Sequence, residues 1–419
     1  MSDDPSNQQP SRDGTTPPAD LAADPEVAVG TDAFENRGAG LDVAVVGGGA
    51  VGATVAYELA SEGADVTLYE RGSIAGGSSG RAAGVCYDAY ADRLDAEIAG
   101  EAIERFRALS GEDTFPFREC PYVWLAREGD EERAEIIREG IERMQAHGVV
   151  ALEVGAEELT ERFPHMRTDD VAVAGIAGAA GYTDPARYTA CLAAAASGAG
   201  ATVRDDTPVA VRTDPLGVTE SAAGASQTHD AVVVAAGAHT GRVLEHAGHA
   251  IAMKPYRVQA VTAGGSLPEP MCYDATNGFY VRPHPDGLLG GNGTEPHEAD
   301  PEAYDRGAND GFADTLLERI ACRFPELRTA PLDVTRDWAG LCTATPDRDP
   351  LVGELEDGLY VATGFQGHGF MRAPAIGRRL ADQVLGGDGI ERFDPTRFRG
   401  TESFEIREGM AIESLPDEK

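Results

Sequence analysis

Apolar positions in the first part of the chain follow strand spacing, then helix spacing, then strand spacing again. Residues 41–46 form a short continuous apolar run, residues 51–60 carry apolar side chains at helical spacing, and residues 65–69 indicate a second strand. A glycine-rich turn separates the first strand from the helix. This order predicts a β-α-β unit with two parallel strands.

The pattern changes twice further along the chain. Short apolar runs and helical periods continue to residue 238, and longer strand-like stretches with Asn-Gly and Asp-Gly turn signals then indicate an antiparallel sheet. A buried strand and a helix return near residue 358. The expected helices span residues 95–107, 131–146, 186–197, 312–324 and 374–386; the expected strands span residues 201–203, 230–238, 251–263, 278–291 and 358–363, with one more leading to residue 338.

These elements predict an α/β fold with two domains. We expect a doubly wound, Rossmann-like nucleotide-binding domain assembled from discontinuous segments, and a second α+β domain built on an antiparallel sheet. The first domain is expected to use residues 39–100, 165–250 and 339–395, and the second to use residues 101–164 and 251–338. Residues 1–38 are expected to be a disordered acidic tail, and residues 396–419 a loose polar tail.

The turn after the first strand has the spacing of a dinucleotide-binding motif. Residues 47–52 read GGGAVG, which fits G-x-G-x-x-G, and Glu70 closes the next strand. Gly47 permits the tight turn, Gly49 lets phosphates approach the backbone, and Gly52 lets helix and strand pack closely. Glu70 is suited to accept hydrogen bonds from ribose hydroxyls. These residues predict a two-nucleotide cofactor, either NAD or FAD, with a glycine-rich turn without a ligand as the alternative.

Charge excludes one class of partner. The chain has 71 acidic and 35 basic residues, a net charge of -36, and its lysines are Lys254 and Lys419. A surface this acidic makes nucleic acid an unsuitable partner. Because 42% of the residues are hydrophobic and the strand and helix periods are clear, we expect a folded protein from a high-salt, halophilic cytoplasm.

Neither a membrane span nor a metal site is expected. No run approaches 18 unbroken apolar residues, and the amino terminus lacks a basic region followed by an apolar stretch, so we predict a cytoplasmic protein. The six cysteines lie far apart without a C-x-x-C pair, which favours buried thiols over metal ligands.

Six short blocks occur in one order and resemble a known family. They are residues 76–84 (GGSSGRAAG), 255–257 (PYR), 280–283 (YVRP), 338–341 (WAGL), 345–347 (TPD) and 367–370 (GHGF). Together they resemble the FAD-dependent enzymes of the D-amino-acid oxidase superfamily, which includes glycine and sarcosine oxidases, dimethylglycine dehydrogenase and L-proline dehydrogenase. The resemblance covers about residues 40–395 and implies FAD in place of NAD.

The resemblance also implies which residues contact FAD. The loop at residues 76–84 passes the pyrophosphate and the inner edge of the flavin, and the segment at residues 364–370 lies against the isoalloxazine ring before a helix. Arg81 would face phosphate or cap its own loop. The expected cofactor contacts are Gly47, Gly49, Ala50, Val51, Gly52, Glu70, Arg71, Ser78, Ser79, Arg81, Ala82, Ala83, Gly84, Val209, Ala236, Gly237, Gly364, Gly367, His368, Gly369, Phe370 and Met371.

The implied reaction is hydride transfer from the carbon beside a substrate nitrogen to flavin N5, which leaves an imine. The substrate would be a small amino acid or N-methyl amino acid. Tyr256 matches a tyrosine that reaches the substrate carboxylate in sarcosine-type relatives, and Arg282 could bind a carboxylate bidentately. Tyr280, Cys342 and His368 complete the candidate catalytic set, although each candidate also has a purely structural interpretation.

Several positions depart from the family pattern. Gly340 stands where sarcosine oxidases carry a flavin-binding cysteine, and Arg81 stands where dimethylglycine dehydrogenases carry a flavin-binding histidine, so we expect noncovalent FAD. Cys342 occupies the place of a carboxylate-binding arginine or tyrosine, so neither substrate carries over. Residues 257–271 contain no lysine, and Met371 replaces another active-site lysine, which favours a dehydrogenase over an oxidase. The acceptor would be oxygen, a carrier protein or a quinone.

Two other functions fit the same residues. One is another two-dinucleotide-fold flavoenzyme whose flavin is reduced by NADPH. The other is a non-catalytic FAD-binding protein that serves assembly or electron transfer. The sequence leaves open the substrate, the electron acceptor, the oligomeric state and the need for a partner subunit.

Overall fold

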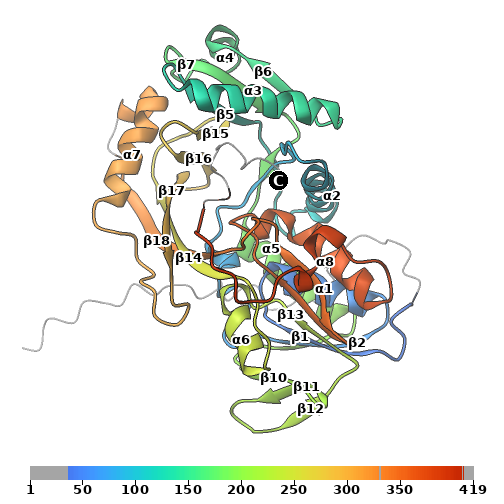
Figure 1. Cartoon of the computed structure of the whole chain (residues 1–419). Helices are drawn as coiled ribbons and strands as arrows, with labels where there is room; N and C mark the ends of the chain where they lie inside the picture. The colour runs from blue at the N-terminus through green and yellow to red at the C-terminus, as the bar shows by residue number, and fades with distance from the viewer. Residues whose placement is uncertain (1–35, 330–331, 408, 410–419) are drawn as a thin grey trace, which may run out of the picture.

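A six-stranded, mostly parallel sheet lies in the lower half of the molecule as drawn in Figure 1, with α6 and the strands β10 to β12 beneath it. The computed structural model describes residues 36–329, 332–407 and 409. The sheet has the order β19-β20-β13-β1-β2-β9, in which only β19 runs antiparallel to its neighbour. Its strands are β1 (Asp42–Val46), β2 (Asp65–Tyr69), β9 (Thr202–Arg204), β13 (Ala231–Val234), β19 (Leu351–Glu356) and β20 (Leu359–Thr363).

Both faces of this sheet are covered, as a parallel sheet requires. Val43 and Val45 point to one core with α1 (Ala50–Ser61), α2 (Arg93–Leu109), α5 (Pro185–Gly198) and α8 (Gly369–Val384). Ala44 and Val46 point to the opposite core with α6 (Thr240–His246) and a small sheet of β10 (Val209–Thr213), β11 (Leu216–Glu220) and β12 (Ser226–Thr228). The doubly wound architecture predicted from the apolar pattern is confirmed.

An eight-stranded sheet forms the second domain and has the order β18-β14-β17-β16-β15-β5-β7-β6. Its neighbouring strands are antiparallel except for β15 and β5. The strands are β5 (Tyr122–Arg127), β6 (Ala151–Val154), β7 (Val171–Ala177), β14 (Lys254–Ala263), β15 (Met271–Asp274), β16 (Phe279–His284), β17 (Gly287–Glu298) and β18 (Val334–Ala344). Helices α3 (Glu131–Ala146), α4 (Ala156–Arg162) and α7 (Phe312–Arg323) pack against it, and β3 (Val85–Cys86), β4 (Arg118–Glu119) and β8 (Gly181–Tyr182) form a small sheet of their own.

The boundary between the two domains differs from the predicted one at three elements. β7 lies in the eight-stranded sheet, β18 crosses the expected boundary at residue 338, and α2 extends beyond residue 100 while packing on α8. A short strand carries no local signal of which sheet it joins, because long-range pairing decides this. The last helix also begins at Gly369, five residues before the expected start, and contains Pro374. Burial of Phe370, Met371 and Ala373 offsets the hydrogen bond lost at that proline.

The described part of the carboxyl-terminal tail is packed, so the expectation of a loose end is wrong there. Ile406 is only 8% exposed and lies against Tyr256 and Ala344. Lys254 Nζ donates a hydrogen bond of 2.6 Å to the Phe404 carbonyl oxygen and lies over the Phe404 ring. Two apolar residues two positions apart put one face of this polar segment onto the sheet.

The expected amino-terminal tail falls mostly outside the described residues. Its last residues are attached to the first domain, where Arg37 Nη1 donates to Asp382 Oδ1 at 2.7 Å and the Gly38 amide donates to the Glu62 carbonyl oxygen. Within the described ranges, no helix has both the length and the apolar character needed to cross a membrane.

Candidate active site

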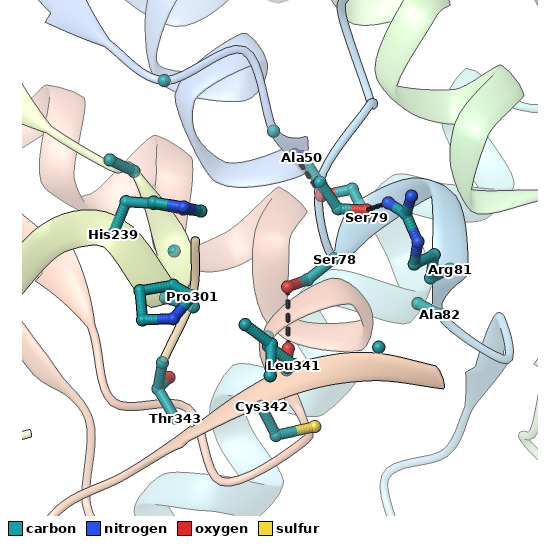
Figure 2. A pocket seen from close by; sticks show the side chains of 18 of the residues that line it. Ala50, Ser78, Ser79, Arg81, Ala82, His239, Pro301, Leu341, Cys342 and Thr343 are labelled. Carbon is teal, nitrogen blue, oxygen red and sulfur yellow. Dashed lines mark hydrogen bonds between the residues drawn. The ribbon is translucent and has the colours of Figure 1, made fainter. Parts of the chain in front are cut away.

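A cavity of about 1160 Å³ lies between the parallel sheet and the antiparallel sheet (Figure 2). One end is lined by residues 207–210 beside β10, and the other by residues 365–371 at the start of α8. The loops after β1, β2 and β13 enter it from the carboxyl ends of these parallel strands, where ligands bind in open α/β sheets. Two halves of the chain that are distant in sequence therefore share one site.

The glycine turn has the close approaches that its motif predicts. Gly47 has a φ of +118°, and a Cβ there would collide with the carbonyl group of Ala235. A Cβ on Gly52 would collide with the Gly47 carbonyl oxygen, so Gly52 serves helix packing and does not line the cavity. Gly49 caps α1, and its Cβ would approach only Ser79 Oγ, at 3.2 Å. The amino-terminal end of α1 thus offers bare backbone to the cavity.

Side chains from neighbouring loops hold this turn. Ser79 Oγ accepts a hydrogen bond of 2.9 Å from the Ala50 amide, as Figure 2 shows. Glu70 Oε2 accepts one of 2.7 Å from the Gly48 amide, and Glu70 Oε1 accepts another from Gly72. Glu70 lines the cavity and also fixes the backbone around the glycine turn.

The loop at residues 76–84 bridges the two domains. Ser78 Oγ donates to the Leu341 carbonyl oxygen of β18 at 2.7 Å (Figure 2). Arg81 Nη1 donates to the carbonyl oxygens of Gly76 and Gly77, so Arg81 caps its own loop while lining the cavity. Trp338 Nε1 donates to the Arg81 carbonyl oxygen at 3.0 Å. Of the two roles considered for Arg81, loop capping is the one that these contacts display.

Three predicted residues converge at the end of the cavity beside α8. Tyr256 on β14 and Cys342 on β18 are direct cross-strand partners. Gly367 faces both, because a Cβ placed on it would lie 3.6 Å from Cys342 Sγ and 3.9 Å from the Tyr256 hydroxyl oxygen. With a φ of +86°, Gly367 also adopts a conformation that favours glycine.

His368 adjoins this group and is uncharged at neutral pH. Its Nε2 atom lies 3.4 Å from the Tyr87 hydroxyl, and the Tyr87 ring stacks on Tyr122 at 4.5 Å. Burial, followed by the charge of Arg372, lowers the pKa of His368 from 6.5 to about 3. Burial also raises the pKa of Tyr87 well above 10. This histidine–tyrosine pair therefore holds no charge at neutral pH.

The expected role of Arg282 as a carboxylate partner is wrong, because its side chain does not line the cavity. Its guanidinium group donates to the carbonyl oxygens of Ala83 at 2.5 Å and Pro283 at 2.7 Å, and lies 4.9 Å from the centre of the Tyr182 ring. Only 4% of the residue is exposed, and burial lowers its pKa to about 10. Arg282 packs beneath the loop at residues 76–84 and supports the cavity wall from behind.

Some of the other predicted residues line the cavity, and others support its wall without lining it. Tyr280 lines the cavity and packs with Trp338, its hydroxyl lying over Gly291. Gly364 is a turn residue with a φ of +78° whose Cβ would collide with Thr345, and it does not line the cavity. The remaining predicted cofactor contacts that line the cavity are Ala50, Val51, Arg71, Ala82, Ala83, Gly84, Val209, Ala236, Gly237, Gly369, Phe370 and Met371.

Several lining residues were not predicted. Tyr87 follows the loop at residues 76–84 by three positions, and this nearness was its only sequence signal. Gln259, Asn292 and Thr294 line the cavity from β14 and β17, where a register shift disturbs the simple alternation of faces. A further set comes from segments with no motif: His239, Arg242, Pro301, Glu302, Tyr304 and Arg306.

The cavity suits an elongated dinucleotide. Its lining includes Glu70 and Val209, the bare amino-terminal end of α1, the small residues of the loop at residues 76–84, and Gly367. This lining offers a carboxylate acceptor, backbone donors and glycines that allow a ligand to approach the backbone. Among the described residues, no group of three histidine, cysteine or acidic side chains is placed to hold a metal ion.

Comparison with known proteins places the chain in one family. The profile of the FAD-dependent oxidoreductase (DAO) family matches residues 42–383, which include the glycine turn, Tyr256, Cys342 and the start of α8. The protein belongs to this family. FAD is therefore the cofactor of this oxidoreductase. The family match confirms the resemblance that the six sequence blocks indicated.

Individual relatives agree with this placement. The oxidoreductase is 28% identical over 359 residues to a glycine oxidase from Geobacillus kaustophilus, with 82% of this chain and 92% of the relative covered. It is 26% identical to the mitochondrial dimethylglycine dehydrogenase of Rattus norvegicus, covering 89% of this chain but only 46% of that protein. The crystal structure of L-proline dehydrogenase from P. horikoshii superposes with a TM-score of 0.77 at 29% identity, covering 86% of this chain and 98% of that one. The names of these relatives give three different substrates, glycine, dimethylglycine and L-proline, so family membership alone leaves the substrate open.

Proposed function

We propose that this oxidoreductase oxidises the C–N bond of a small amino acid or N-methyl amino acid, and that it acts as a dehydrogenase. The observation that carries the proposal is the convergence of Tyr256, Cys342 and Gly367 beside His368 at one end of the FAD cavity. The names of the relatives, which include glycine oxidase and dimethylglycine dehydrogenase, support the same substrate class. Bound FAD would supply the acceptor for the two electrons of the C–N bond.

The protein's own part is to orient the substrate. In this proposal the hydroxyl of Tyr256, a residue only 1% exposed, donates a hydrogen bond to the substrate carboxylate. Gly367 lets the backbone approach the reacting region, and the positive end of α8 begins two residues later. Fixed orientation of this kind can lower a barrier by several kcal/mol without a reacting side chain.

The neutral His368–Tyr87 pair has a consequence for the substrate amine. A histidine with a pKa of about 3 cannot take a proton from an ammonium group at neutral pH, nor can a tyrosine that is still protonated. In this proposal the amine therefore reaches the reacting position uncharged, without proton transfer to His368 or Tyr87. We expect kcat/KM to rise with pH until the pH exceeds the pKa of the substrate amine, because the uncharged fraction of the amine rises in the same way.

The assignment as a dehydrogenase rests on the position of the lysine outside the cavity lining. Lys254 is the lysine within the described ranges, and its ammonium group is bound to the Phe404 carbonyl oxygen, away from the cavity lining. Among the residues that the structure describes, no lysine lines the cavity. Oxygen therefore lacks an ammonium group that would favour its reduction, which suits transfer of the electrons to a carrier protein or quinone.

The proposal includes noncovalent FAD. Gly340 lines the cavity without a side chain, and a Cβ there would lie 3.4 Å from Arg81 Cβ. Neither Gly340 nor the guanidinium of Arg81 supplies a nucleophile for a bond to the flavin. Denaturation with acid should release all FAD into the supernatant.

Steady-state turnover tests the proposal. Glycine, sarcosine, dimethylglycine and proline would be assayed with an artificial dye acceptor and, separately, with oxygen. We expect one of these compounds to support dye reduction faster than oxygen consumption, and Tyr256→Phe to raise KM more than it lowers kcat. Oxygen consumption that matches dye reduction would contradict the dehydrogenase assignment, and failure of every amine would contradict the substrate class.

A further inference from the structure

The segment at residues 299–306, between β17 and α7, lies across the cavity and is anchored to the antiparallel sheet. The Ala299 amide donates to the Pro255 carbonyl oxygen at 2.8 Å, and the Arg306 carbonyl oxygen accepts from the Ala339 amide at 2.8 Å. Pro301, Glu302, Tyr304 and Arg306 line the cavity. Both ends of the segment are thus tied to the second domain, while its middle lines the cavity.

The middle of the segment is tied to the other domain by charge. Glu302 Oε1 lies 2.5 Å from Arg71 Nη1 and 3.3 Å from His239 Nε2. Asp300 Oδ1 lies 2.7 Å from Arg242 Nη2. Arg71 follows β2, and Arg242 belongs to α6, so the ion pairs span the cavity from the parallel-sheet side.

Figure 2 shows Pro301 beside His239 in the cavity. The same carboxylates are held in their charged form. Hydrogen bonding from Arg71 lowers the pKa of Glu302. The amide of Glu302, followed by Arg242, lowers the pKa of Asp300. The contacts therefore persist at neutral and mildly acidic pH.

These side chains are about half exposed, so each pair alone contributes little. Their arrangement gives them a joint effect, because both arginine–carboxylate pairs close the same short segment over the same cavity, whereas burial lowers the pKa of His239 and keeps this neighbour of Glu302 uncharged. The segment could move away by breaking ion pairs with the first domain, while the strands on either side keep their ladder hydrogen bonds.

We propose that residues 299–306 form an ion-paired cover over the cofactor cavity, which opens for FAD to enter or leave. The cover retains FAD through Asp300 and Glu302, which need not touch the cofactor. This role goes beyond the proposed reaction, because it concerns retention of the oxidised cofactor and applies whatever the substrate is.

The rate of FAD release from the oxidised protein tests the cover. Release would be followed by the rise in flavin fluorescence after dilution, at fixed salt, with no amine present. Asp300→Asn keeps the oxygen that accepts from the Glu302 amide but removes the charge, and should speed release about threefold. Glu302→Gln disrupts contacts to both Arg71 and His239, and should speed release by about three- to tenfold.

A double-mutant cycle separates the cover from a direct contact between Arg242 and FAD. If the pair acts as a unit, Asp300→Asn with Arg242→Gln should release FAD no faster than the quicker single variant. Glu158→Gln is a matched control, because Glu158 pairs with Arg162 at 2.7 Å with similar exposure but outside the cavity lining. Its release rate should equal that of the unmodified protein.

Unchanged release in both Asp300→Asn and Glu302→Gln would overturn the cover, as would strictly additive effects of Asp300 and Arg242. The melting temperature of each apoprotein should stay within about 2 °C of the parent, since exposed pairs contribute little to global stability. A failure of every amine to reduce the flavin would refute the proposed function while leaving this measurement valid.

Discussion

His368 provides the sharpest test of the electrostatics of the site. In the folded protein its pKa is about 3, compared with 6.5 for an unburied imidazole. Above pH 6.5 the side chain is neutral in both states and contributes no pH dependence. As the pH falls below 6.5, the unfolded chain takes up a proton that the folded chain cannot, so stability is lost progressively down to about pH 3.

The size of this effect follows from the shift. At pH 5 the pH lies 1.5 units below the pKa of 6.5 that the imidazole has in the unfolded chain. The free energy of unfolding is therefore lowered by about 2 kcal/mol, at about 1.36 kcal/mol per unit. The full shift of 3.5 units sets an upper limit of about 5 kcal/mol near pH 3. Other groups also titrate in this range, so the comparison must be made against a variant that lacks the imidazole.

Denaturant unfolding of the FAD-loaded protein at pH 7 and pH 5 measures this contribution. The parent should lose about 2 kcal/mol more between the two pH values than His368→Gln does. His147→Gln, at an exposed position, is the matched control for replacing a histidine with glutamine. Equal losses in the parent and in His368→Gln would refute the conclusion that His368 is buried and neutral.

Three further predictions concern residues that shape or support the cavity. Gly49→Val should abolish FAD retention in gel filtration, since a side chain there would enter the open approach to the amino-terminal end of α1, while circular dichroism remains that of a folded protein. Ile406→Ala should lower the free energy of unfolding by about 2 kcal/mol in a denaturant titration, because Ile406 is buried against Tyr256. Arg282→Met should lower it by about 1–3 kcal/mol by leaving the Ala83 carbonyl oxygen unpaired, with no change in KM for the amine; a raised KM alone would restore Arg282 to the substrate site.

The parts of this molecule that sequence predicts well are those set by local rules. The β1-α1-β2 unit follows from the spacing of Gly47, Gly52 and Glu70, because the turn, the helix packing and the strand end are all decided within thirty residues. The meeting of Tyr256 with Gly367 was accessible only through the resemblance, since β14 and α8 are separated by more than one hundred residues.

The contacts of Arg282 and of the cover at residues 299–306 depend on long-range packing, which local sequence patterns do not predict. The guanidinium of Arg282 is bound by the carbonyl oxygen of Ala83, and no local pattern near β16 indicates that a loop two hundred residues earlier lies against it. Residues 299–306 form a polar connection without a motif, and their importance depends on Arg71 and Arg242 standing across the cavity. Phe404 and Ile406 were too few in a polar segment to indicate packing.

The central claim is that an amine alone reduces the bound flavin. The direct measurement is anaerobic mixing of the FAD-loaded protein, in molar salt, with glycine, sarcosine, dimethylglycine and proline, and separately with NADPH, while the flavin absorbance is recorded. The account predicts that at least one of the amines bleaches the flavin and that NADPH does not. Bleaching by NADPH alone, or by none of these compounds, would contradict it.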